Sequence, residues 1–237
     1  QYLETTVLPT ILGIETVAPD GEGPQDKMAS RHFLEMRSRL REANVAILAD
    51  AKRYDFNSKK MFETYEMFFV RTARKFHPKL FLLAFDLDFR LIVASANLTE
   101  SGFHRNLEAV WIGSTAQGDR FGRAARAAID FIDGVRKKEW PSSRSLSGTL
   151  SELRRRAPKN MGGPDLLHSG SSKCILDQLL SHLPRGRSVE ELHVVSPFFD
   201  RGDRLGPMGR FKGTKAHIYV REERLGSKPA YRLQASK

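Results

Sequence analysis

The chain has 237 residues, of which 40% are hydrophobic and 28% are charged, a balance typical of a globular protein. No stretch approaches the roughly 20 apolar residues that a membrane-spanning helix needs, and the first residues lack the basic region and cleavage site of a signal peptide. The formal net charge of +11 favours a polyanionic partner, with nucleic acid first and an anionic membrane surface second.

The chain has a single cysteine, Cys174, so it cannot form a disulfide within itself. This usage favours a reducing compartment, and we therefore expect a cytoplasmic location, with Cys174 as a small buried apolar residue.

The first 71 residues alternate between apolar runs and turn-forming segments. In chain order they predict a helix over 2–14, a loop over 18–27, a helix over 31–43 capped by Ser30, a strand over 45–50 and a strand over 61–71. The strand over 45–50 is apolar nearly throughout, which predicts burial on both faces.

The clearest pattern lies in the middle of the chain. Residues 79–85 and 90–96 are two apolar runs separated by the turn DLDF at 86–89, so they predict a hairpin inside a sheet. A further strand is predicted over 106–113, and a helix over 119–133.

Beyond residue 133 the composition changes. Residues 134–165 contain Gly, Pro and Ser clusters with many basic residues, which predicts a basic linker, with a short helix at 148–156 as an alternative. A helix over 171–183, a strand over 191–199 and a strand over 217–220 follow.

Two ends of the predicted hairpin carry polar side chains. His77 and Lys79 precede its first strand, and Asn97 follows its second, so an antiparallel pairing would bring them to one edge of the sheet. A lysine charge, an amide donor and a neutral imidazole suit binding of a tetrahedral oxyanion and attack on it. Taken singly, each has a simpler interpretation: a turn histidine, an edge lysine and a helix N-cap.

The segment HPKLFLLAFDLDFRLIVASANLTESGFHRNLEAVW resembles the catalytic segment of the phospholipase D superfamily. The family pattern of His-x-Lys, a hairpin, a small residue, Ser, any residue and Asn is matched by His77, Lys79, Ala94, Ser95 and Asn97. The following LTESGFHRNLE is also typical, and SPFFD at 196–200 is similar to the start of the superfamily's second half.

Two departures from the commonest pattern indicate which branch of the family the segment resembles. Ala84 stands where many members have Asp, although Asp86 and Asp88 lie nearby, and the spacing from His77 to Asn97 is three residues longer than usual. Both features are more similar to the tyrosyl-DNA phosphodiesterase branch and related bacterial nuclease-like members than to lipid-cleaving enzymes.

The resemblance implies an α/β fold with a phospholipase-D-like mixed β-sheet flanked by helices. The expected organisation is one such unit over 1–133, the basic linker over 134–165, and the start of a second unit over 166–237 that is incomplete. It also implies a phosphodiesterase that needs no metal or other cofactor. In this reading His77 attacks phosphorus to form a phosphohistidine, and Lys79 and Asn97 clamp the phosphate.

Two further residues of the segment could support that site. Glu108 could orient His77 through its ring N–H or be a strand-edge carboxylate, and Ser95 could bind phosphate or pack within the hairpin. No histidine other than His77 is followed at the second position by lysine, so the second His-x-Lys of the family is missing. The chain is therefore expected to be a fragment, a homodimer that completes the site, or inactive; we favour the fragment.

The basic residues of the predicted linker complete the functional prediction. They are expected to contact a nucleic-acid backbone, and they are Arg136, Lys137, Lys138, Arg154, Arg155 and Arg156. DNA is the favoured substrate. A lipid phosphodiesterase and a non-catalytic nucleic-acid-binding module are the alternatives.

Overall fold

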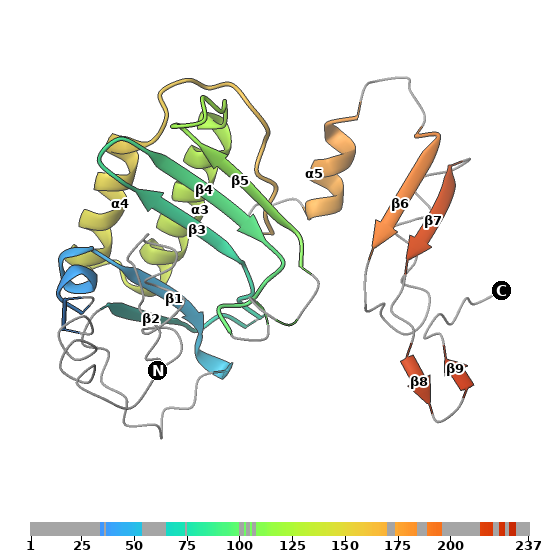
Figure 1. The fold of residues 1–237 in the computed structure, drawn as a ribbon, viewed down its shortest axis with the longest axis horizontal. Coiled ribbons are helices and arrows are strands. Elements are labelled where there is room, and N and C mark those ends of the chain that lie inside the picture. Colours follow the sequence, from blue (N-terminus) through green and yellow to red (C-terminus); the bar gives the residue numbers. More distant parts are fainter. Residues whose placement is uncertain are drawn as a thin grey trace, which may run out of the picture. The chain divides into compact units, whose positions relative to one another are not determined.

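The computed structural model (Figure 1) divides into two compact units, residues 1–166 and residues 167–237, which are described separately. The division falls next to residue 166, where the sequence predicts a second unit to begin. The described residues are 34–35, 37–53, 65–73, 75–99, 102, 105, 108–169, 174–183, 189–195, 214–219, 223–225 and 228–230.

The first unit has two sheets with different pairing. Strands β1 and β2 pair in parallel, and β3, β4 and β5 pair antiparallel in that order. Their bounds are Ala46–Asp50 for β1, Glu66–Val70 for β2, Leu80–Ala84 for β3, Phe89–Ala94 for β4 and Val110–Ser114 for β5, with a 3₁₀ turn η2 at Ala51–Arg53 after β1. The predicted α/β class is confirmed, but in the described residues these strands form two sheets rather than one mixed sheet.

The predicted hairpin is confirmed as β3 and β4, with Leu80 opposite Val93 and Ala84 opposite Phe89. Its turn is anchored by Asp88, whose carboxylate accepts hydrogen bonds from the hydroxyls of Ser114 and Thr115 and from the backbone N–H of Ala116 at 2.9–3.0 Å. Burial alone would raise the pKa of Asp88, but these hydrogen bonds outweigh it and hold that pKa well below its ordinary value. The turn is thereby tied to the end of β5.

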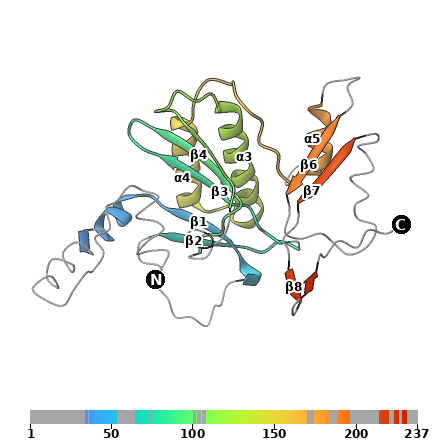
Figure 2. The ribbon, with the colours of Figure 1, turned by 45° about the vertical axis from the view of Figure 1, so that its right-hand side comes forward.

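Two helices, α3 (Gly122–Glu139) and α4 (Arg144–Arg156), lie side by side against one face of this sheet (Figures 1 and 2). The buried alanines of α3 allow its backbone to approach the sheet closely. They pack in one core with aromatic and aliphatic side chains of β4 and α4; its buried members include Phe89, Leu91, Ala124, Ala125, Ala128, Leu146 and Leu150. Ser143 caps α4 by accepting the backbone N–H of Leu146 at 3.3 Å.

The prediction of a linker over 134–165 is wrong. Residues 134–139 continue α3, and the alternative short helix at 148–156 is confirmed as part of α4, which begins earlier, at Arg144. The following stretch packs back onto α3: Arg123 donates to the Gly163 carbonyl at 2.6 Å and pairs with Asp165 at 2.8 Å. Gly163 has φ +95°, and a Cβ there would collide with the backbone of Arg120, so glycine is required.

Other predictions for the first unit have mixed outcomes. The strand over 45–50 is confirmed as β1, the strand over 61–71 is confirmed at 66–70, and residues 34–35 and 37–42 are helical within the predicted helix. The predicted helix over 2–14, the loop over 18–27 and the Ser30 cap lie outside the described residues.

The second unit contains one described helix and two strand pairs. These are α5 (Ile175–Ser181), the parallel pair β6 (Glu191–Val195) and β7 (Lys215–Tyr219), and the antiparallel pair β8 (Glu223–Leu225) and β9 (Lys228–Ala230). Cys174 caps α5 and is exposed, so its predicted burial is wrong. The SPFFD segment lies outside the described residues. Among the helices that the structure describes, none combines the length and the apolar character required to cross a bilayer.

Candidate functional site

The predicted site lies at one end of the three-stranded sheet. Because β3, β4 and β5 alternate in direction, the start of β3, the end of β4 and the start of β5 meet at the same edge. The ladders continue past the strands, since Ala94 donates to the Lys79 carbonyl at 3.0 Å and Ser95 donates to the Ala109 carbonyl at 2.9 Å. The sheet therefore brings the segments around His77, Asn97 and Glu108 to one edge.

His77 and Lys79 are in direct contact. The Lys79 Nζ lies 2.8 Å from His77 Nδ1 and 2.9 Å from its Nε2, so the ammonium contacts both ring nitrogens. The His77 side chain is exposed, whereas Lys79 is half-buried. Burial lowers the pKa of Lys79 from its ordinary value, and the negative charge of Glu108 partly offsets this.

Ser95 and Glu108 form the second contact of the site. The Ser95 hydroxyl donates to the Glu108 carboxylate and accepts the backbone N–H of Ala109 at 2.9 Å. Ser95 thus holds Glu108 at the start of β5, and the Glu108 charge acts on Lys79. The predicted orientation of His77 by Glu108 stays a prediction.

Asn97 follows β4 and has an exposed side chain. Its carbonyl accepts the backbone N–H of Thr99 at 2.8 Å, and Gly102 in turn donates to the Thr99 hydroxyl at 3.2 Å. A Cβ on Gly102 would lie 2.4 Å from the Asn97 carbonyl oxygen, so Gly102 packs directly against the Asn97 backbone. Residues 98 and 99 form a bend, which excludes Asn97 as the cap of a helix that begins there.

These groups have complementary chemistry. A lysine ammonium and an asparagine amide can donate to phosphate oxygens, and a neutral imidazole can attack phosphorus or transfer a proton. His77, Ser95 and Asn97 are all exposed residues, so the site lies at the surface of the unit. The arrangement therefore suits binding of an oxyanion beside a nucleophile.

The structure gives most basic residues of the two tracts acidic partners within the fold, and their predicted nucleic-acid contacts stay predictions. The Arg136 side chain is only 12% exposed, pairs with Asp133 at 2.8 Å and donates to the Pro141 carbonyl, so it stabilises the end of α3. Arg154 bridges from α4 to α3 by pairing with Asp130 at 3.0 Å and Asp133 at 2.9 Å. Arg154 therefore links the two helices, whereas Arg136 ties the end of α3 to the following loop.

The other basic residues of the tracts differ in exposure and in partners. Arg155 and Arg156 both pair with Glu152 at 2.5 Å, and these hydrogen bonds lower the pKa of Glu152 to about 2. Lys137 is 68% exposed and pairs with Asp133 at 3.0 Å, and Lys138 is also exposed. Lys137 and Lys138 are therefore the members of this set best placed to meet a polyanion.

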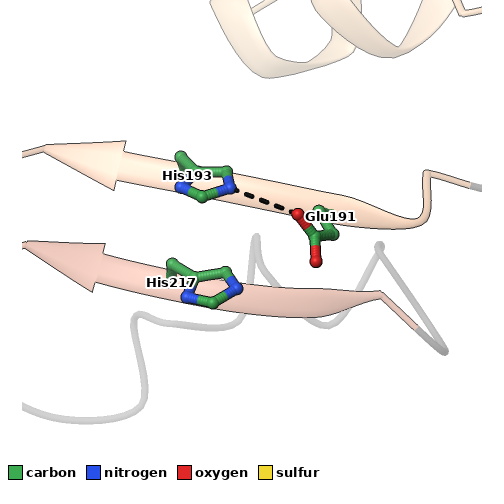
Figure 3. A group of neighbouring side chains, drawn as sticks. All are labelled: Glu191, His193 and His217. Carbon is green, nitrogen blue, oxygen red and sulfur yellow. Dashed lines mark ion pairs between the residues drawn. The ribbon is translucent and has the colours of Figure 1, made fainter.

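Sequence reasoning missed a cluster in the second unit. Glu191 and His193 lie on β6 and His217 lies on β7, and the three offer ligand atoms within 4.8 Å of one another (Figure 3). The signal in the sequence was weak: an E-x-H pattern in one strand, with another histidine in a later strand. Only the register, which sets His193 opposite His217, brings them together.

The chain was also compared with known proteins. No protein-family model matches it, and no significant match is found among curated proteins.

Proposed function

We propose that this chain carries the nucleophilic side of a phosphodiesterase site that cleaves phosphodiester bonds, with DNA as the favoured substrate. The observation that supports the proposal is the meeting of the His77–Lys79 contact, the Ser95–Glu108 contact and the exposed Asn97 at one end of the β3–β4–β5 sheet. The resemblance of this same segment to the phospholipase D superfamily supports the same chemistry.

The proposed reaction has two steps. A ring nitrogen of His77 attacks phosphorus, a P–N bond forms, and the P–O bond to the leaving group breaks while Lys79 and Asn97 bind the non-bridging oxygens. Water then attacks the phosphohistidine and releases the phosphate product and His77. An alkoxide leaving group needs a proton from a general acid, and a second His-x-Lys that would supply it is missing from the sequence.

The choice of leaving group can separate the requirement for the nucleophile from the requirement for the general acid. A p-nitrophenolate leaves without protonation, so thymidine 3′-(p-nitrophenyl phosphate) tests the nucleophile even where the acid is missing. With ³²P in the phosphate, the chain should acquire a label that survives alkali and is lost in mild acid, as a phosphohistidine does. An ordinary oligonucleotide with an alkyl leaving group should label far more slowly.

Three variants identify the residues involved. His77→Ala should abolish the label, and Lys79→Met should slow labelling by about 10²–10³-fold because one charged donor to the oxyanion is lost. His182→Ala removes an exposed histidine of the second unit and should label normally. Labelling that persists in His77→Ala, or its absence from the parent chain with the aryl substrate, would refute the proposed nucleophile.

A non-catalytic DNA-binding module is the second candidate, because the sequence lacks the second His-x-Lys motif. It predicts binding to duplex or single-stranded DNA that weakens with rising salt concentration and is unchanged by His77→Ala. Such binding, combined with no labelling by the aryl substrate, would favour this module over the enzyme.

A further inference from the structure

The second unit carries a histidine pair that the proposed phosphodiesterase chemistry does not use. His193 on β6 and His217 on β7 are directly opposite in the parallel register, and their rings stack with centroids 4.6 Å apart and planes 7° apart. Glu191 lies two residues before His193 on the same strand, so the two side chains share one face of the sheet. Its carboxylate is 3.5 Å from His193 Nε2 (Figure 3).

One atom of this cluster lacks the partner that its burial requires. His217 Nε2 is buried, and it has no hydrogen-bond partner among the residues that the structure describes. A buried polar nitrogen without a partner costs about 1–3 kcal/mol. Such an atom in a native protein calls for an explanation, and a bound ion is one of the few that apply.

We propose that Glu191, His193 and His217 bind a divalent transition-metal ion of the zinc class, which links β6 to β7. The ligand atoms lie within 4.8 Å of one another, whereas ligands about 2.0–2.1 Å from a tetrahedral zinc ion are about 3.3 Å apart. Rotation of three side chains that are exposed or only partly buried closes that difference without a change of register. The lone pair of His217 Nε2 would then be used by the metal.

The donor set selects the class of ion. Two imidazole nitrogens and one carboxylate oxygen form a common zinc ligand set, which leaves a fourth position for water or another ligand. Magnesium and calcium prefer oxygen ligands alone, and Cu(I) prefers thiolate or thioether sulfur. All three ligands belong to the second unit, and the proposal gives the metal no part in the proposed phosphodiesterase reaction.

One neighbouring charge opposes cation binding. Lys215 is directly opposite Glu191 in the register, and its Nζ lies 3.6 Å from the Glu191 carboxylate. Its side chain is 69% exposed and can turn into solvent when the carboxylate binds a metal. Removal of this charge should therefore strengthen metal binding, an effect that a purely structural role of the cluster does not predict.

The test is calorimetric titration of the full chain with Zn²⁺, in a preparation without a polyhistidine tag and first treated with a chelator. One equivalent should bind, and Co²⁺ in its place should give the intense visible absorption of a four- or five-coordinate ion. His217→Ala and Glu191→Gln should each weaken Zn²⁺ binding by at least about tenfold, since even loss of a group that only supports a ligand has that effect. Lys215→Met should tighten it several-fold.

His182→Ala provides the matched control, because it removes an imidazole of the same unit outside the cluster and should leave Zn²⁺ affinity unchanged. Circular dichroism of each variant identifies any that fail to fold. His217→Gln, which keeps a polar side chain of similar size, should lose Zn²⁺ binding as His217→Ala does. The proposal is overturned if no Zn²⁺ binding is detected at Zn²⁺ concentrations of about 100 μM. It is also overturned if both His217 variants bind Zn²⁺ with the affinity of the parent chain.

Discussion

Lys79 is half-buried, contacts the ring of His77 and is within the influence of the negative charge of Glu108. Burial disfavours the charged form of an amine, and a nearby carboxylate favours it, so these two influences on the Lys79 pKa oppose each other. Burial is the larger of the two, and the pKa falls below its ordinary value. Glu108, held by Ser95, therefore keeps Lys79 charged over a wider pH range than burial alone would allow.

Glu108→Gln should lower the pKa of Lys79 further, because the offsetting charge is removed while the burial remains. The measurement is an NMR titration of the ¹³Cε resonances of labelled lysines, with Lys79 assigned from the signal that disappears in Lys79→Met. Glu66→Gln, which removes an exposed acid from β2, should leave the Lys79 titration unchanged. A Lys79 pKa that stays constant or rises in Glu108→Gln would contradict the described electrostatics.

The α3–α4 pair is held by one buried carboxylate. Asp133 on α3 accepts from Arg136 at 2.8 Å and from Arg154 of α4 at 2.9 Å, and its side chain is 7% exposed. Burial alone would raise the pKa of Asp133, but hydrogen bonds from Arg136, Arg154 and Lys137 outweigh it and hold the pKa well below its ordinary value. The basic residues that suggested a solvated linker are thus partners of an acid within the fold.

Asp133→Asn should lower the free energy of unfolding by roughly 3 kcal/mol, because it leaves the largely buried Arg136 guanidinium without its opposite charge. The same substitution at Asp130 provides the control: that carboxylate is on the same helix and pairs with Arg154, but it is 70% exposed. Asp130→Asn should cost less than about 0.5 kcal/mol. Urea unfolding measures both, and equal losses would show that the buried network does not stabilise the helix pair.

At the scale of the whole molecule, the net charge of +11 coexists with carboxylates whose pKa the fold lowers. A carboxyl group with a lower pKa in the folded state stabilises the protein above its unfolded pKa of about 4. That contribution falls as the pH drops through the folded pKa, because the unfolded chain binds protons first. Asp88 and Asp133 both behave in this way.

The free energy of unfolding should therefore decrease as the pH falls from about 5 to 2, measured by urea unfolding at each pH. The double variant Asp88→Asn, Asp133→Asn should be less stable at neutral pH but lose less on acidification. The double variant Asp86→Asn, Asp130→Asn makes the same change in net charge at two exposed acids. Its free energy of unfolding should decrease with falling pH as steeply as that of the parent chain. If the two double variants have the same acid slope, general charge repulsion rather than these two carboxylates sets the acid dependence.

Local patterns in the sequence determined much of the first unit. The β3–β4 hairpin follows from two apolar runs around a turn, and the placement of His77, Lys79 and Asn97 at one edge follows from antiparallel pairing. Those are relations between residues close in the chain, so periodicity and turn chemistry are sufficient to predict them. The α/β class follows from the same patterns.

Only the tertiary structure decided the rest. The Gly, Ser and Arg content of 144–156 concealed an amphipathic helix, which is stable because Leu146 and Leu150 are buried against the sheet and α3. Whether Arg136 and Arg154 meet DNA or Asp133, and whether His193 faces His217, depends on helix packing and strand register between distant segments. Composition carries no information about that register, and for this reason the charge pairing and the proposed metal site emerged only from the fold.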